Sequence, residues 1–145
     1  MDLAQFTASL RNHRPRASRP VTLEAIYATA HWLLTRERFA DAAKVFRVML
    51  QIAPRDERAW LGLGECHERV EQPRIAAELY GAGSVIAGGA QNLSVRCLIA
   101  RARMMSRLGR GVEVDGILDT AERAAVEQAD EHLVEFVACE RRRLS

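Results

Sequence analysis

The stretch that decides the fold runs from Ala59 to Tyr80 and reads AWLGLGECHERVEQPRIAAELY. Its large and small residues stand at fixed offsets, at Trp60, Leu63, Gly64, Ala76 and Tyr80. Pro73 suits the first turn of a helix and opens the second of two helices. A glycine inside the first helix costs roughly 1 kcal/mol relative to alanine, so Gly62 and Gly64 need a compensating reason. Close packing of the second helix supplies that reason at Gly64.

These offsets are those of the tetratricopeptide repeat, a unit of about 34 residues that folds into two antiparallel helices. Only one residue of the pattern is missing, because His67 stands where the first helix carries a tyrosine. The chain is therefore predicted to be all-α: a tetratricopeptide-repeat solenoid of three helix pairs plus N-terminal and C-terminal helices.

Two more degenerate repeats flank this unit. The first has, at the Trp, Gly, Ala and Phe positions of the pattern, Ile26, Ala30, Ala42 and Phe46. The third repeat begins about four residues later than the repeat length predicts, and residues 88–91 account for this insertion. At the Trp, Gly, Tyr and Phe positions it then has Leu98, Ala102, Met105 and Leu118. The expected helices span 23–36, 39–52, 57–70, 73–87, 93–108, 112–126 and 129–142, with Thr22 and Asp56 as caps.

The predicted domain division has three parts. Residues 1–21 form an amphipathic helix, with Leu3, Phe6 and Leu10 on one side, and an Arg/Pro linker. Residues 22–128 form the repeats, and residues 129–145 form a capping helix and a basic tail. The N-terminal helix is too short to be stable alone, so we expect it to dock on its own repeats or on a second copy as a homodimer.

Composition excludes several classes of protein. The net charge of +2 does not call for a nucleic-acid partner. Three cysteines without a CxxC motif favour neither a disulfide framework nor a zinc site, and they indicate a reducing cytosol. Arginine supplies all basic charge except that of Lys44, and with the high alanine content this suggests a bacterial genome rich in G and C. The sequence shows no signal peptide and no apolar run long enough for membrane insertion.

No pattern in the chain predicts catalysis. The GLGEC segment lacks the preceding strand and the third glycine of a dinucleotide fingerprint. The four histidines are scattered, and Cys66 and His67 point in different directions on a helix. We therefore expect no enzyme activity, no cofactor and no metal site.

Stacked helical repeats expose a concave surface that binds peptides, and the first helix of each pair lines it. The inward positions predict an apolar floor at Tyr27, Leu34, Leu61 and Ile99. Polar and charged residues are expected beside this floor, at His31, Glu65, Arg96 and Arg103. Some of these side chains are equally expected if they pack against the terminal helices instead.

The segments LEAIYATA, DAAKVF, DERAWLGLGEC and AAELYGAGSVI resemble the class II chaperones of bacterial type III secretion. The resemblance covers residues 23–125 and is densest around LGLG and YGAG. It implies a cytoplasmic protein that holds hydrophobic translocator proteins before export, with an extended segment of the translocator in the concave groove. Arg96 and Arg103 would then clamp the segment's carbonyls or acidic side chains.

Three alternatives stay open. A chaperone of another secretion component, such as a needle subunit, would hold an amphipathic helix rather than an extended segment. A generic repeat adaptor would have no connection with secretion. A nucleic-acid binder would rely on the arginines of residues 11–19 and 141–143, and its affinity would fall steeply with salt.

Overall fold

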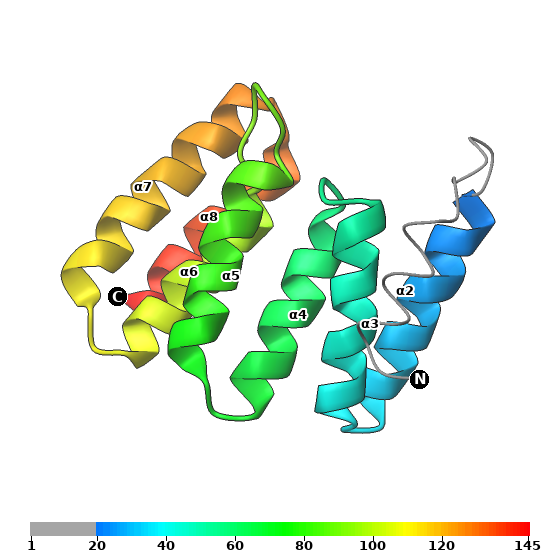
Figure 1. The fold of residues 1–145 in the computed structure, drawn as a ribbon. Coiled ribbons are helices and arrows are strands. Elements are labelled where there is room, and N and C mark those ends of the chain that lie inside the picture. Colours follow the sequence, from blue (N-terminus) through cyan, green and yellow to red (C-terminus); the bar gives the residue numbers. More distant parts are fainter. Residues whose placement is uncertain (1–19) are drawn as a thin grey trace.

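The computed structural model describes residues 20–145, which form seven helices and, within this range, no strand (Figure 1). In chain order they are α2 (Pro20–Thr35), α3 (Phe39–Ile52), α4 (Glu57–Arg69), α5 (Pro73–Ile86), α6 (Val95–Arg107), α7 (Gly111–Glu127) and α8 (Glu131–Leu144). The all-α prediction is confirmed, with the pairs α2/α3, α4/α5 and α6/α7 followed by α8. The predicted N-terminal helix and nearly all of the Arg/Pro linker lie outside the described residues, so that part of the domain division stays a prediction.

Side-chain caps mark the starts of three helices. Asp56, Ser94 and Asp130 each accept a hydrogen bond from a backbone N–H in the first turn of α4, α6 and α8. The predicted cap at Asp56 is confirmed. The predicted cap at Thr22 is wrong, because α2 already begins at Pro20, where the fixed φ of proline suits the first turn of a helix.

The turn inside each helix pair contains one residue in the left-handed region. These residues are Glu37, Glu71 and Gly109, with φ angles of 59°, 60° and 72°. Glu37 and Glu71 lie one repeat length apart, whereas Gly109 follows after a longer interval. The extra residues form the connection between α5 and α6, as the alignment of the third repeat predicts.

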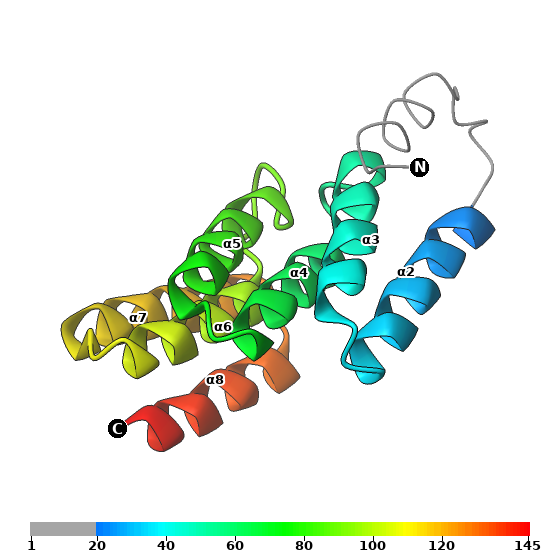
Figure 2. The ribbon, with the colours of Figure 1, turned by 60° about the horizontal axis from the view of Figure 1, so that its bottom comes forward.

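The helices form two layers (Figures 1 and 2). Each helix packs against its neighbour in sequence, and α2, α4, α6 and α8 also contact one another in succession. No comparable contact joins α3, α5 and α7. The first helices of the pairs therefore form the inner layer and the second helices the outer layer, as in a solenoid with a concave side.

Each of the two glycines in the middle of α4 leaves room for a different aromatic ring. A Cβ atom at Gly64 would lie less than 3.0 Å from three ring atoms of Tyr80 on α5, and one at Gly62 would collide with the ring of Phe46 on α3. The close helix contact predicted at Gly64 is therefore confirmed. Gly62 makes the matching contact with the preceding pair, so α4 packs closely on both sides.

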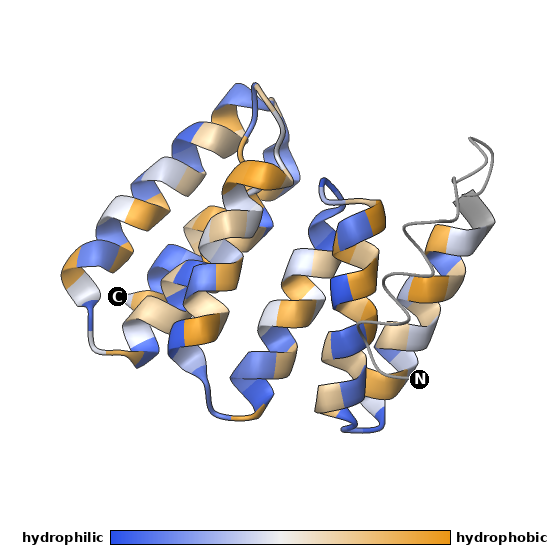
Figure 3. Ribbon diagram, in the orientation of Figure 1, coloured by the Kyte–Doolittle hydropathy of each residue, from blue (hydrophilic) through white to orange (hydrophobic). Residues whose placement is uncertain are grey.

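The apolar core consists of two clusters. One joins α2, α3 and α4 around Phe46 and Met49, and the other joins α5, α6, α7 and α8 around Ile99 and Leu118. Hydrophilic and hydrophobic residues alternate along each helix in Figure 3, as expected for helices that bury one side. No helix within residues 20–145 combines the length and apolar character that crossing a bilayer requires.

Candidate functional site: the concave groove

The inner layer is hollowed between α4 and α6. A depression of about 340 Å³ lies there, lined by Leu61, Glu65, Glu68, Arg69, Tyr80, Ala100 and Arg103. Leu61 and Ala100 supply apolar surface, and charged side chains of both signs surround them. Such a lining suits the burial of an apolar side chain from an extended segment whose backbone is hydrogen-bonded by the polar groups.

Tyr80 reaches this depression from α5. Its phenol donates a hydrogen bond to Oε2 of Glu68 at 3.2 Å. Burial, together with the nearby Glu68 carboxylate, raises the pKa of Tyr80, so the phenol stays a neutral donor. Sequence reasoning placed Tyr80 only at the helix contact, because it belongs to the second helix of its pair.

Arg103 is held by the C-terminal helix. Its Nε and Nη2 atoms lie 2.9 and 2.8 Å from the two carboxylate oxygens of Glu140, whose side chain is only 3% exposed. The hydrogen bond from Arg103 lowers the pKa of Glu140. The Arg103 guanidinium also lies 6.0 Å from the ring centroid of Phe136. Any clamp that Arg103 makes on a bound segment must therefore operate beside this internal ion pair, which fastens α8 to α6.

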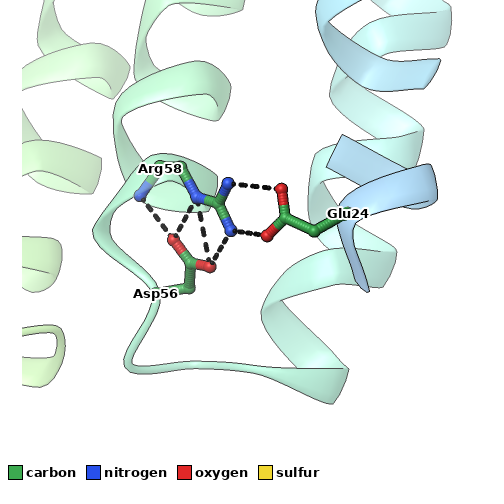
Figure 4. A network of polar contacts seen from close by, with 3 residues as sticks. All are labelled: Glu24, Asp56 and Arg58. Carbon is green, nitrogen blue, oxygen red and sulfur yellow. Dashed lines mark hydrogen bonds and ion pairs between the residues drawn. The ribbon is translucent and has the colours of Figure 1, made fainter. Parts of the chain in front are cut away.

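The α2 end of the inner layer is organised by Arg58 (Figure 4). Its Nη2 atom lies 2.7 Å from Oε1 of Glu24 and 2.7 Å from Oδ2 of Asp56. Hydrogen bonds from Arg58 lower the pKa of both carboxyl groups. The guanidinium also stacks over the ring of Tyr27, with its central carbon 4.4 Å from the centroid. Arg58 thus joins α2 to α4 and shields one side of a predicted groove residue.

The remaining predicted groove residues fall into two kinds. Leu34 and Ile99 belong to the core, with exposed fractions of 7% and 1%, so they offer a bound segment almost no surface. His31 and Arg96 are exposed. The ring of His31 lies 5.9 Å from that of Tyr27, and Nη1 of Arg96 lies 3.2 Å from Oε1 of Glu57.

Ion pairs recur between successive repeats at similar places. Near one end of the first helices, Glu24 pairs with Arg58 at 2.7 Å and Glu57 with Arg96 at 3.2 Å. Near the other end, Glu37 pairs with Arg69 at 3.4 Å and Glu71 with Arg107 at 3.2 Å. Exposed pairs of this kind add little stability each, but together they set the register of α2, α4 and α6.

The structure thus brings three predicted residues together in one depression: Leu61, Glu65 and Arg103. Ala100 was missed, although it adjoins Ile99 in sequence. A helix turns by about 100° per residue, so an error of one position exchanges a groove residue for a core residue.

Part of the chain is similar in sequence to characterised proteins. A stretch of 65 residues is 32% identical to the low calcium response locus protein H of Yersinia pestis and of Yersinia pseudotuberculosis. The match covers 45% of this chain and 39% of each relative, so the chain matches less than half the length of these curated relatives. No family model matches the chain.

A solved structure extends the likeness over most of the chain. The type III secretion translocator chaperone SycD of Yersinia enterocolitica is 25% identical, with a TM-score of 0.68 over 81% of this chain and 86% of that chain. The chain is similar to this translocator chaperone in sequence and in fold.

Two more structures show the same fold as this translocator chaperone. PcrH of Pseudomonas aeruginosa is 22% identical, with a TM-score of 0.70 over 90% of this chain and 97% of that chain. SycD in complex with a peptide of the translocator YopD is 22% identical, with a TM-score of 0.61 over 83% of this chain and 95% of that chain. The proteins found by comparison are thus of the kind that the residues around LGLG and YGAG resemble.

Proposed function

We propose that this chain is a cytoplasmic bacterial chaperone that holds an extended segment of a translocator protein in its concave groove. The observation that carries the proposal is the depression between α4 and α6, where Leu61 and Ala100 lie among Glu65, Tyr80 and Arg103. The complex of SycD with a YopD peptide supports the same kind of client for this chain.

The residues of the groove suit selective binding of moderate affinity. Membrane-seeking segments expose apolar patches that cause aggregation before export. An apolar side chain of the client would rest on Leu61 and Ala100, and Arg103, whose side chain is partly exposed, has further N–H groups that could donate to its backbone carbonyls. One or two such anchors give a complex that the export machinery can take apart.

The test replaces Leu61 with aspartate and titrates a peptide of the client identified by co-purification. Burying an apolar anchor is worth roughly 1.5–3 kcal/mol, so Leu61→Asp should weaken binding about tenfold or more. The matched control is Val112→Asp, because Val112 is 93% exposed at the start of α7 and lies outside the depression. The arginines of the C-terminal tail are also remote from the depression, but Arg141 is unsuitable as a control. Its Nη2 atom lies 2.7 Å from Oδ1 of Asp119 and 3.2 Å from Oε2 of Glu122, so replacing it would disturb the packing of α8 on α7.

Two outcomes contradict the proposal. Equal affinities for Leu61→Asp and Val112→Asp would show that the segment does not lie in this depression. A client that becomes helical on binding, seen by circular dichroism, would instead favour a needle-subunit type of client.

The same proposal includes a homodimer through the N-terminal helix. The apolar side of that helix, with Leu3, Phe6 and Leu10, requires a partner surface. The side chain of Trp32 on α2 is 50% exposed and offers one. Removing residues 1–19 should halve the mass found by sedimentation, and an unchanged mass rules out this dimer.

A further inference from the structure

A second depression, of about 490 Å³, lies between α5, α6 and the turn before α7. Arg101 and Met105 line it from α6, one helical turn apart, and Arg74 and Gly81 line it from α5. None of these residues lines the depression between α4 and α6. On α6 the concave groove is reached by Ala100 and Arg103 instead. The two depressions therefore lie on different sides of α6.

The charge around this outer depression is unbalanced. Three arginines, Arg74, Arg101 and Arg110, surround it, against one carboxylate, that of Glu78. Arg110 is occupied by Glu113, with Nη2 and Oε1 2.6 Å apart. Within residues 20–145, no hydrogen bond or ion pair engages the side chain of Arg74 or of Arg101. The inner layer differs, because its arginines pair with carboxylates of the next or preceding helix of that layer. These arginines are Arg58, Arg96, Arg103 and Arg107.

Gly81 shapes the wall opposite Arg101. A Cβ atom at Gly81 would lie 3.5 Å from Cδ and Nε of Arg101, which is ordinary contact distance. The arginine side chain therefore lies along the bare backbone of α5, and it is half-buried there. Leu108 adds partly exposed apolar surface, and Met105 lies beneath it in the core. A half-buried guanidinium beside apolar surface favours a carboxylate partner over water, because a charge-assisted hydrogen bond is strong in such a setting.

We propose that this outer depression is a second protein-binding site, which takes an acidic, amphipathic segment of a partner protein. Carboxylates of the partner would meet Arg74 and Arg101, and an apolar side chain would rest on Leu108, which is partly exposed. A nucleic acid fits less well, because a row of phosphates would meet Glu78 in the depression and Glu113 beside it. The site is independent of the concave groove, so a partner could be engaged while a client is bound.

The test uses two fluorescent helical peptides and the full-length chain. One peptide carries glutamate and leucine on the same side, and the matched peptide carries glutamine in place of glutamate. The wild-type protein should bind the glutamate peptide more tightly. The double variant Arg74→Gln, Arg101→Gln should bind it about tenfold more weakly, since each charge-assisted hydrogen bond is lost. The control Arg123→Gln removes an exposed charge of α7 outside the depression and should leave binding unchanged.

A steric variant tests the same site without altering charge. Gly81→Leu should fill the depression and weaken the glutamate peptide to a similar degree. The variant should fold, because the backbone there is helical and the Cβ contacts are ordinary. Leu61→Asp in the concave groove should not affect this peptide.

Three outcomes overturn the proposal. In the first, the glutamate and glutamine peptides bind equally, or all arginine variants weaken binding equally, which indicates nonspecific attraction. In the second, Leu61→Asp abolishes binding, which places the peptide in the concave groove. In the third, a DNA duplex competes with the peptide and depends on Arg74 and Arg101, which makes the site a nucleic-acid site.

Discussion

Replacing Gly64 with alanine tests the closest helix contact of the solenoid. The new Cβ atom would lie less than 3.0 Å from three ring atoms of Tyr80. That ring cannot easily move away, because Tyr80 is 3% exposed and its hydroxyl is bonded to Glu68. Overpacking of a buried site costs typically about 1–3 kcal/mol. Alanine also favours the helix by about 1 kcal/mol over glycine, so we expect a net loss of about 0–2 kcal/mol from Gly64→Ala.

Gly116 provides a matched control in α7. It is exposed in a helix, and a Cβ atom there would have no neighbour within 4 Å. Gly116→Ala should therefore stabilise the protein by about 1 kcal/mol. The same change is made in both variants, so helix propensity and the unfolded state contribute equally to both. The difference between them, about 1–3 kcal/mol, is the strain against Tyr80.

Urea unfolding followed by circular dichroism measures both free energies of unfolding. Equal stabilisation by Gly64→Ala and Gly116→Ala would refute the reasoning, because it would show that Tyr80 yields without strain. The glycine at position 64 would then have no packing role.

Further expectations concern the C-terminal part of the chain. Ala129 has a φ of 52°, in the left-handed region that disfavours residues with a Cβ. Ala129→Gly should therefore raise the free energy of unfolding by about 1 kcal/mol. The control Ala138→Gly, inside α8, should lower it by about 1 kcal/mol. Hydrogen bonding from Arg103 keeps the pKa of the Glu140 carboxyl group below its usual range. As the pH falls, this carboxyl group therefore takes up a proton in the unfolded chain before it does so in the folded chain. The stability that the ion pair contributes is present at neutral pH and is lost on acidification below about pH 4. Glu140→Gln should destabilise the protein at pH 7 and flatten this part of the acid-unfolding profile; an unchanged profile would show that the pair with Arg103 contributes nothing.

Local patterns determined most of the fold. The offsets of Trp60, Gly64, Ala76 and Tyr80 predicted the central helix pair, and α3 begins and ends where the sequence predicted. The weak third repeat was also placed correctly: Leu98, Ala102 and Leu118, at its signature positions, are buried. Periodicity suffices for these features because each depends on one helix and its neighbour in sequence.

The groove was predicted less completely. Position counting along a helix identifies its inner side, and this found Leu61, Glu65 and Arg103. It does not measure how far a side chain sinks into the core, so Leu34 and Ile99 were taken for floor residues although they are buried. Tyr80 was missed because it enters the groove from the neighbouring helix.

The sequence by itself determined the all-α class, the three pairs, the insertion before α6 and the likeness to the translocator chaperones. Only the tertiary structure decided which side chains are already engaged: Arg58 stacks on Tyr27, Arg103 pairs with Glu140, and Gly62 receives Phe46. It also decided that Arg74 and Arg101 line an outer depression. The physical reason is the range of the interactions. Helix formation and repeat spacing are encoded within a few turns, whereas burial and ion pairing depend on residues that folding brings together from distant parts of the chain.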